Sequence, residues 1–293
     1  MLKESFLRYL RFERNYSEHT IVAYGNDLDE FEAYCRKQME GFDFTTVDAD
    51  VIRAWVVSLM DRHYEATSVN RKLSSLRSFY HYLLREGKVI VDPAAKVVGP
   101  KKKKPLPTFV RDADMDRLLD ECEFEDSYAG RRDHTILALF YETGIRLSEL
   151  VGLQVSDVDF STRVIKVTGK RNKQRVVPFG RRMEDQLKTY LEARGIFVGC
   201  LTGPLFYSNS GRPIRGKTVY WLVRKHLSRV VAQKKKSPHV LRHTFATSML
   251  NHGADLEAVK ELMGHERLST TQVYTHTTFD ELKKVYKQAH PRA

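Results

Sequence analysis

Six side chains in the second half of the chain are of types that could act together on a phosphate group. They lie in four short segments, GIRLSEL, TGKRNKQR, SPHVLRHTF and LMGHERLSTTQVYTH. The side chains are Arg146, Lys170, His239, Arg242, His265 and Tyr274. His239 and Arg242 are three residues apart, so on a helix they share one face.

Together these residue types can break and remake a phosphodiester bond without a metal ion. The guanidinium groups of Arg146 and Arg242 could each bind two phosphate oxygens and stabilise a five-coordinate transition state. A tyrosine hydroxyl such as that of Tyr274, with an ordinary pKa of about 10, is a nucleophile that needs help to lose its proton. Lys170 could protonate the departing 5′ oxygen. The sequence has no aspartate-rich metal cradle, so we expect no metal and no other cofactor.

Each residue also has a simpler interpretation. Arg146 could form a helix salt bridge with Glu149, and Lys170 could be one of several lysines in a hairpin. His265 follows a glycine and could lie at the end of a helix, where glycine and histidine are both common. Tyr274 could be an ordinary core tyrosine.

A zinc site is a further alternative for the SPHVLRH stretch. His239 and His243 are four residues apart, as zinc ligands on a helix can be. No glutamate follows His239, and the sequence has no third ligand at the spacing of known zinc motifs. We therefore expect His243 to be a buried, hydrogen-bonded histidine, with His239 and Arg242 facing a ligand from the start of the helix.

The elements after residue 110 are predicted to be mainly helical. Helices are expected at Ala113–Cys122, Ala129–Thr143, Leu147–Leu150, Met183–Arg194, Lys217–Val231, Val240–His252, Leu256–Met263 and Phe279–Ala289. Between residues 158 and 180 the period changes to that of two strands, Val164–Val167 and Val176–Phe179, joined by the turn GKRNKQ. We therefore expect a mainly α fold with a small antiparallel β-sheet.

The first hundred residues are predicted to form three helices, at residues 17–36, 49–62 and 68–86. The third helix has a polar face of small hydroxyl and basic side chains. This face comprises Asn70, Arg71, Lys72, Ser74, Ser75, Arg77, Ser78 and His81. Such a face suits a phosphate backbone, and it could equally be an ordinary solvated face.

A linker separates two predicted domains. Residues 97–110 read VVGPKKKKPLPTFV, a proline- and lysine-rich composition that cannot bury a core. A chain of 293 residues is long enough for two cores. We therefore expect a helical domain over residues 1–96, a linker over 97–110 and a second domain over 111–293.

The charge of the chain points to an anionic partner. The net charge is +12, and nucleic acid is the commonest partner of so basic a protein. Residues 1–50 contain six basic and eleven acidic side chains, whereas residues 51–104 contain twelve basic and four acidic ones. This change of sign along the chain favours a basic patch over a general excess of base.

Composition argues for a cytoplasmic protein without a membrane partner. The three cysteines, Cys35, Cys122 and Cys200, are far apart, and their odd number fits no disulfide framework. No apolar run reaches the roughly 18 residues that a membrane span needs. The N-terminal residues carry charges throughout and lack the features of a secretory signal.

The four segments, in their order along the chain, resemble the tyrosine recombinase (phage integrase) family. The similarity includes GIRLSEL, GKRNKQRVVP, HVLRHTFATSML and LMGHERLSTTQVYTH, and it covers nearly the whole chain. It implies a helical, SAM-like core-binding domain that clasps DNA, followed by a catalytic domain. The N-terminus leaves no room for the arm-binding domain of phage integrases. This, together with the ending FDELKKVYKQAHPRA, resembles the Xer subfamily, which resolves chromosome dimers.

The resemblance also implies a role for each of the six side chains. Tyr274 would attack the phosphate and become linked to the 3′ end of the DNA. Arg146, Arg242 and His265 would bind the phosphate, and Lys170 would be the general acid.

His239 would assist proton transfer at the tyrosine or orient the phosphate. None of the six positions departs from the family pattern, and His243 matches a common family residue without a catalytic role.

The partners implied are double-stranded DNA with two half-sites, a second Xer-type recombinase in a heterotetramer, and a DNA translocase as activator. The last predicted helix, Phe279–Ala289, has an apolar stripe. The resemblance implies that this stripe docks into a neighbouring protomer, and the alternative is that it packs on its own domain.

Three other functions compete with a Xer-type recombinase. An integrase of a mobile element would use the same chemistry. A type IB topoisomerase would use similar residues to relax DNA without a defined site or a second duplex. A non-enzymatic DNA-binding protein of the same fold would not need the complete set of six side chains.

Overall fold

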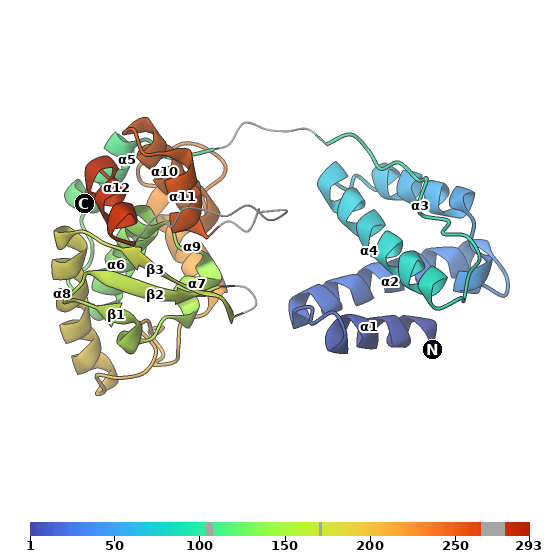
Figure 1. Cartoon of the computed structure of the whole chain (residues 1–293), viewed down its shortest axis with the longest axis horizontal. Helices are drawn as coiled ribbons and strands as arrows, with labels where there is room; N and C mark the ends of the chain where they lie inside the picture. The colour runs from blue at the N-terminus through green and yellow to red at the C-terminus, as the bar shows by residue number, and fades with distance from the viewer. Residues whose placement is uncertain (103–107, 170–171, 265–278) are drawn as a thin grey trace. The chain divides into compact units, whose positions relative to one another are not determined.

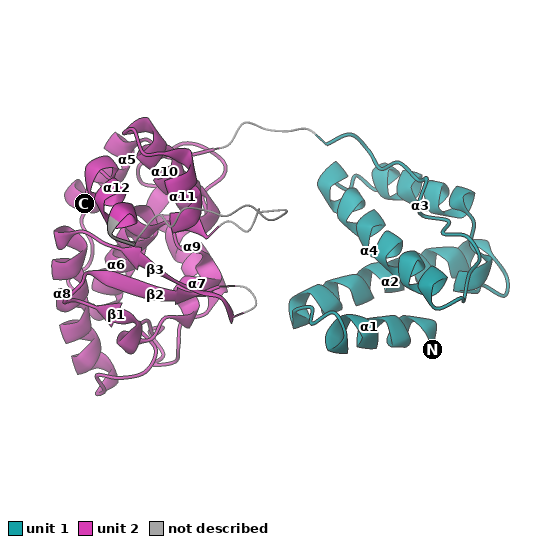
Figure 2. Cartoon of the chain, viewed as in Figure 1, with its two compact units in different colours: residues 1–105 teal, residues 106–293 magenta. Residues whose placement is uncertain are grey.

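The computed structural model describes residues 1–102, 108–169, 172–264 and 279–293. It divides into two compact units, Met1–Pro105 and Leu106–Ala293 (Figures 1 and 2). Each unit has its own hydrophobic core.

The first unit is helical. Its elements are α1 (Leu2–Phe12), α2 (Glu18–Gln38), the 3₁₀ turn η1 (Phe44–Thr46), α3 (Ala49–Asp61) and α4 (Ala66–Arg85). Ser17 and Asp48 accept hydrogen bonds from the first backbone N–H groups of α2 and α3, as N-caps do. Aromatic side chains fill the core, with the rings of Phe31 and Trp55 5.0 Å apart. The three predicted helices are present, whereas α1 was not predicted.

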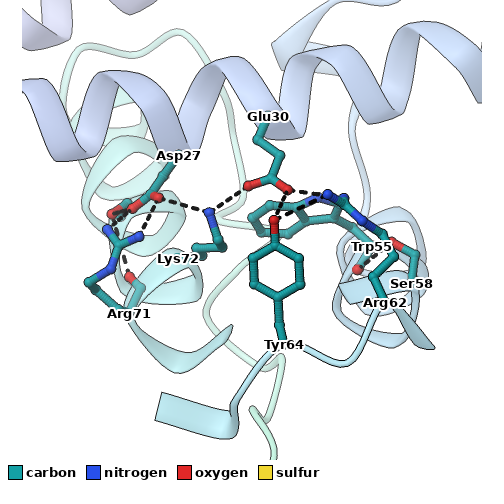
Figure 3. Close-up of polar contacts among 9 residues, drawn as sticks. Asp27, Glu30, Trp55, Ser58, Arg62, Tyr64, Arg71 and Lys72 are labelled. Atoms are coloured by element: carbon teal, nitrogen blue, oxygen red, sulfur yellow. Dashed lines mark hydrogen bonds and ion pairs between the residues drawn. The ribbon is translucent and has the colours of Figure 1, made fainter. Parts of the chain in front are cut away.

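Part of the polar face of α4 is occupied by acidic side chains of α2 (Figure 3). Asp27 is buried and accepts hydrogen bonds from Arg71, from Lys72 at 3.2 Å and from Ser75 at 2.7 Å. Glu30 accepts another from Lys72. Lys72 and Ser75 are themselves buried, so the interpretation that they face a phosphate backbone is wrong. The physical reason is that a buried carboxylate needs cations and donors around it.

The second unit combines helices with a small sheet (Figure 1). Its helices are α5 (Asp112–Asp116), which continues into the π-helical turn η2 (Arg117–Glu121), α6 (Tyr128–Thr143), α7 (Leu147–Gly152), α8 (Arg181–Val198), α9 (Gly216–Leu227), α10 (Pro238–Asn251), α11 (Leu256–Met263) and α12 (Phe279–Ala289). The 3₁₀ turn η3 (Val155–Asp157) precedes strands β1 (Val158–Asp159), β2 (Val164–Thr168) and β3 (Gln174–Pro178). The strands form an antiparallel sheet in the order β1-β2-β3. The predicted fold class, mainly α with a small antiparallel sheet, is confirmed.

Element ends differ from the prediction in places. The short strand β1 was not predicted, because two residues show no period of their own. Helix α9 ends at Leu227, four residues before the predicted end at Val231. Helix α8 continues to Val198, where Gly199 takes a left-handed conformation and ends it.

Helix α12 packs on its own unit. Leu282, Tyr286 and Ala289 are buried against a cluster that includes Phe245 of α10 and Leu262 of α11. The alternative, that the stripe packs on its own domain, describes the single chain, and docking into a neighbouring protomer stays a prediction. An apolar stripe exposed to water is costly, and in an isolated chain the remaining way to cover it is to pack on the same chain.

The residues after α12 are also anchored on the second unit. His290 is buried and shares a 3.2 Å hydrogen bond with the carbonyl oxygen of Tyr141. Arg292 forms ion pairs with Asp116 and Asp120, at 3.1 and 2.7 Å. Among the helices in the described part of the chain, none has the length and apolar character of a membrane span.

Candidate active site

The first part of the site lies where α6 gives way to α7. Gly144 ends α6 with a φ of +59°, a left-handed conformation that glycine adopts without strain. A Cβ at Gly144 would lie 2.3 Å from the ring of Phe245, so a larger residue would also clash. The turn places Arg146 at the N-cap of α7, with its side chain 38% exposed.

Arg146 is held by a buried carboxylate. Its Nη1 donates to Oε1 of Glu149 at 2.8 Å, and its backbone N–H donates to Oε2 at 2.7 Å. Its Nη2 donates to the carbonyl oxygen of Gly264 at 2.8 Å. The suggested pairing of Arg146 with Glu149 is thus present. It does not remove Arg146 from the site, because the side chain remains partly exposed.

The second part of the site is the start of α10. Pro238 occupies the first turn, where its missing N–H costs nothing. Arg242 is buried, and its two Nη atoms donate to the carbonyl oxygens of Gly144 and Met263. Burial, together with the nearby charge of Arg146, lowers the pKa of Arg242 to about 10, so it is still a cation at neutral pH.

His239 and His243 lie one turn apart on α10 and contact each other. Their Nε2 atoms are 3.0 Å apart, which is a hydrogen-bond distance. His239 is exposed, whereas His243 is half-buried and not fully buried as expected. Burial lowers the pKa of His243, and the neighbouring His239 and Arg242 add to this effect. Among the described residues, no group of three His, Cys, Asp or Glu side chains could hold a metal ion.

One cavity joins the two parts of the site. It has a volume of about 740 Å³, and Arg146, His239 and Arg242 all line it. Its remaining walls come from α7, α9 and the residues just before α10. They include Leu147, Val151, Tyr220 and Ser237. The structure therefore brings Arg146 together with His239 and Arg242, which lie in a different segment of the sequence.

The sequence did not identify Arg175 of β3 as a site residue. Its guanidinium donates to both oxygens of Glu149, at 2.7 and 3.0 Å, and its Nε donates to the carbonyl oxygen of Leu262 at 2.9 Å. Burial alone would raise the pKa of Glu149, but the hydrogen bonds from Arg175 and Arg146 hold it at about 2. Glu149 is therefore ionised throughout the physiological range.

Arg146, Arg175, Arg242 and Glu149 form what we call the arginine cluster. Three cations face one carboxylate, so the cluster has a surplus of positive charge. In the described part of the chain, Arg242 contacts backbone carbonyls and no carboxylate. A surplus of this kind next to an open cavity is what an anion such as a phosphate requires.

The other three predicted side chains, Lys170, His265 and Tyr274, lie outside the described residues. The residues just before two of them are described. Gly169, before Lys170, would place a Cβ 3.4 Å from Oε1 of Glu149. Gly264, before His265, is the residue whose carbonyl oxygen accepts a hydrogen bond from Arg146.

Comparison with known proteins identifies the family. Residues 108–281 match the phage integrase family, and residues 4–87 match the phage integrase N-terminal SAM-like domain. The chain is 42% identical over 291 residues to the tyrosine recombinase XerC of Pelobacter propionicus, covering 99% of this chain and 95% of the relative. It is 40% identical over 300 residues to the tyrosine recombinase XerC of Listeria innocua, covering 100% and 98%.

The fold is also that of a solved recombinase. The structure of the XerH site-specific recombinase bound to palindromic difH substrate superposes with a TM-score of 0.72. That likeness covers 99% of this chain and 82% of the other at 19% identity, and it bears on the fold alone. The chain belongs to the phage integrase family of tyrosine recombinases, enzymes that break and rejoin DNA at specific sites. The prediction of a Xer-type recombinase is confirmed.

Proposed function

We propose that the chain cuts one DNA strand at a time through Tyr274, which becomes linked to the 3′ phosphate. In this reaction Arg146, Arg242 and His265 bind the phosphate, and Lys170 protonates the departing 5′ oxygen. The covalent intermediate conserves the energy of the broken bond. The 5′ hydroxyl of another strand can therefore attack it and rejoin the DNA without an external energy source.

The observation that carries this proposal is the shared cavity of Arg146, His239 and Arg242. Two guanidinium groups can together contact both non-bridging oxygens of a phosphate and the charge that develops on them in the transition state. His239 is exposed at the same cavity, so it can hydrogen-bond a bound phosphate or the attacking hydroxyl.

We further propose that the substrate is double-stranded DNA with two half-sites and that the reaction resolves chromosome dimers at cell division. The full-length similarity to proteins named XerC supports this role, and the related XerH structure contains its difH substrate. The first unit would bind DNA as the core-binding domain. A second Xer-type recombinase would complete a heterotetramer, with a DNA translocase as its activator and the cytoplasm as its location.

The test is the formation of a covalent protein–DNA adduct. A half-site is first selected from a random DNA pool by the protein itself, and a nicked two-half-site duplex is then built from it. The nick lets the cut end diffuse away and traps the intermediate, which a denaturing gel shows as a slower band. Mass spectrometry of the digested adduct should locate the nucleotide on Tyr274.

The matched control is Tyr274→Phe, which keeps the ring and removes the attacking oxygen. We expect this variant to bind the half-site normally and to form no adduct. An adduct of unchanged yield in Tyr274→Phe would rule out this nucleophile. Relaxation of supercoiled DNA that lacks the selected site would favour a topoisomerase instead.

A further inference from the structure

Arg175 of β3 binds Glu149, the same carboxylate that binds Arg146. We propose that it is a positioning residue of the recombination reaction, which fixes Glu149 and, through Glu149, the guanidinium of Arg146. This inference rests on the proposed role of Arg146 in binding the phosphate. In this role Arg175 does not itself contact the DNA.

The strand register explains why an arginine points into the unit at this position. Arg175 lies opposite Val167 of β2, and it shares a face of β3 with Val177, two residues on. Val167 and Val177 are both fully buried, and the Arg175 side chain is only 17% exposed. A cation on the core face of a sheet is costly unless it is paired, and Glu149 provides that pairing.

With Arg175 bound, each oxygen of the Glu149 carboxylate accepts two hydrogen bonds. Oε1 accepts from Arg146 at 2.8 Å and from Arg175 at 2.7 Å. Oε2 accepts from the Arg146 backbone at 2.7 Å and from Arg175 at 3.0 Å. With both oxygens bonded twice, the carboxylate has one orientation, and the guanidinium of Arg146 is held in the cavity wall at one place.

Arg175 also ties two further parts of the site to the same carboxylate. Its Nε holds the carbonyl oxygen of Leu262 in the last turn of α11, the helix that precedes His265 in sequence. It lies in β3, the next strand after Lys170 in sequence. A single side chain thus connects β3, α7 and the end of α11.

Lysine cannot reproduce this arrangement. The guanidinium of Arg175 makes three hydrogen bonds in fixed directions, two to the carboxylate and one to the carbonyl. A lysine ammonium keeps the charge but is a point donor on a flexible stem, so it cannot hold Glu149 by both oxygens and Leu262 together. Arg175→Lys therefore separates geometry from charge.

The experiment measures binding and cleavage separately for the full-length Arg175→Lys protein. Half-site affinity is measured by gel shift, and the single-turnover rate of adduct formation is measured on the nicked duplex with saturating protein. We expect affinity to change less than about 3-fold and the cleavage rate to fall about 10- to 100-fold, as when a supporting group behind a reacting one is lost. The matched control is Arg163→Lys, whose ion pair with Glu184 lies outside the arginine cluster, and we expect its cleavage rate to be normal.

A double-mutant cycle tests whether Arg175 acts through Glu149. If it does, adding Arg175→Lys to Glu149→Gln should slow cleavage by less than about 3-fold beyond Glu149→Gln alone, because coupled residues are non-additive. Full additivity of the two losses would overturn the proposal. Loss of half-site binding in step with cleavage would also overturn it, since Arg175 would then serve only the fold.

If the wild-type protein forms no adduct on the selected site, the proposed function fails and takes this inference with it. If the wild type forms the adduct and Arg175→Lys matches it in rate, the positioning role alone is wrong.

Discussion

The ionised state of Glu149 makes a quantitative prediction about stability. Its side chain is fully buried, and its pKa of about 2 lies well below its ordinary value of 4.5. A group with a lowered pKa in the folded state stabilises the fold above its unfolded-state pKa, and this contribution is lost as the pH falls through the folded value. The fall from 4.5 to about 2 corresponds to about 3 kcal/mol.

The perturbation is Glu149→Gln, which keeps the shape and removes the charge. At pH 7 we expect the second unit to lose about 3 kcal/mol of unfolding free energy, because Arg146 and Arg175 lose their shared anion. Between about pH 4.5 and pH 2 the difference from wild type should shrink towards zero, since protonated glutamate and glutamine are alike in charge. The variant is therefore less stable than the wild type by the largest amount at neutral pH, and this difference in unfolding free energy disappears in acid.

The assay is urea unfolding at several pH values, followed by tryptophan fluorescence. The chain has two tryptophans, Trp55 in the first unit and Trp221 in the second. A Trp55→Phe background, used for every protein compared, leaves Trp221 to report on the second unit. The matched control is Glu257→Gln, which removes a carboxylate that is 75% exposed and pairs with Lys260 in α11.

We expect the control to lose far less stability than Glu149→Gln, because solvent screens exposed pairs. A Glu149→Gln penalty that is the same at pH 7 and at pH 3 would refute the reasoning. So would a penalty no larger than that of Glu257→Gln.

Three further predictions follow from the contacts. Adduct formation should persist in excess EDTA, since arginine and lysine cations serve the phosphate; loss in EDTA with recovery in Mg²⁺ would contradict this. Truncation after Thr278 should lower the melting temperature of the DNA-free protein, measured by circular dichroism, because it uncovers Phe245; an unchanged transition would show that α12 adds nothing to its own core. Asp27→Asn should cost about 3 kcal/mol in urea unfolding of the first unit, whereas the exposed Asp29→Asn should cost much less; equal costs would mean that the buried network of Figure 3 is not stabilising.

Most of the fold could be predicted because the apolar residues of its helices and strands recur with the period of each element. Helix α1 is the main exception. Phe6 and Leu10 are buried, and Leu2, Leu7 and Tyr9 pack beside them, so the helical period was present in the sequence and was overlooked. Strand β1 could not be predicted at all, because its two residues are extended only through their pairing with β2.

The site was predictable in its residue types and not in its contacts. Arg146, His239 and Arg242 were identified because their chemistry and order form a set, and the cavity brings these three together. Arg175 was missed because it stands among six other basic residues between residues 166 and 182. Its alternation with Val177 was the available signal, since it places an arginine on the core face of a strand.

The acceptors of the arginine cluster could not be found in the sequence, and they explain how the site keeps its charge. Arg175, Arg242 and Arg146 donate in turn to the carbonyl oxygens of Leu262, Met263 and Gly264 at the end of α11. Every residue has a carbonyl group, so no residue type marks these three. A helix C-terminus has unpaired carbonyls and a partial negative charge, which together satisfy guanidinium donors.

A second or third carboxylate would hold the arginines as well as these carbonyls do, but each would cancel one positive charge. Carbonyl dipoles satisfy the hydrogen bonds of Arg242 without a countercharge, which leaves the arginine cluster with the surplus that a phosphate needs. An additional carboxylate near this cluster should therefore stabilise the free protein and weaken the binding of the transition state. Among the described residues, Glu149 is the carboxylate that fixes Arg146, and because both of its oxygens are fully bonded it does so at the loss of one positive charge.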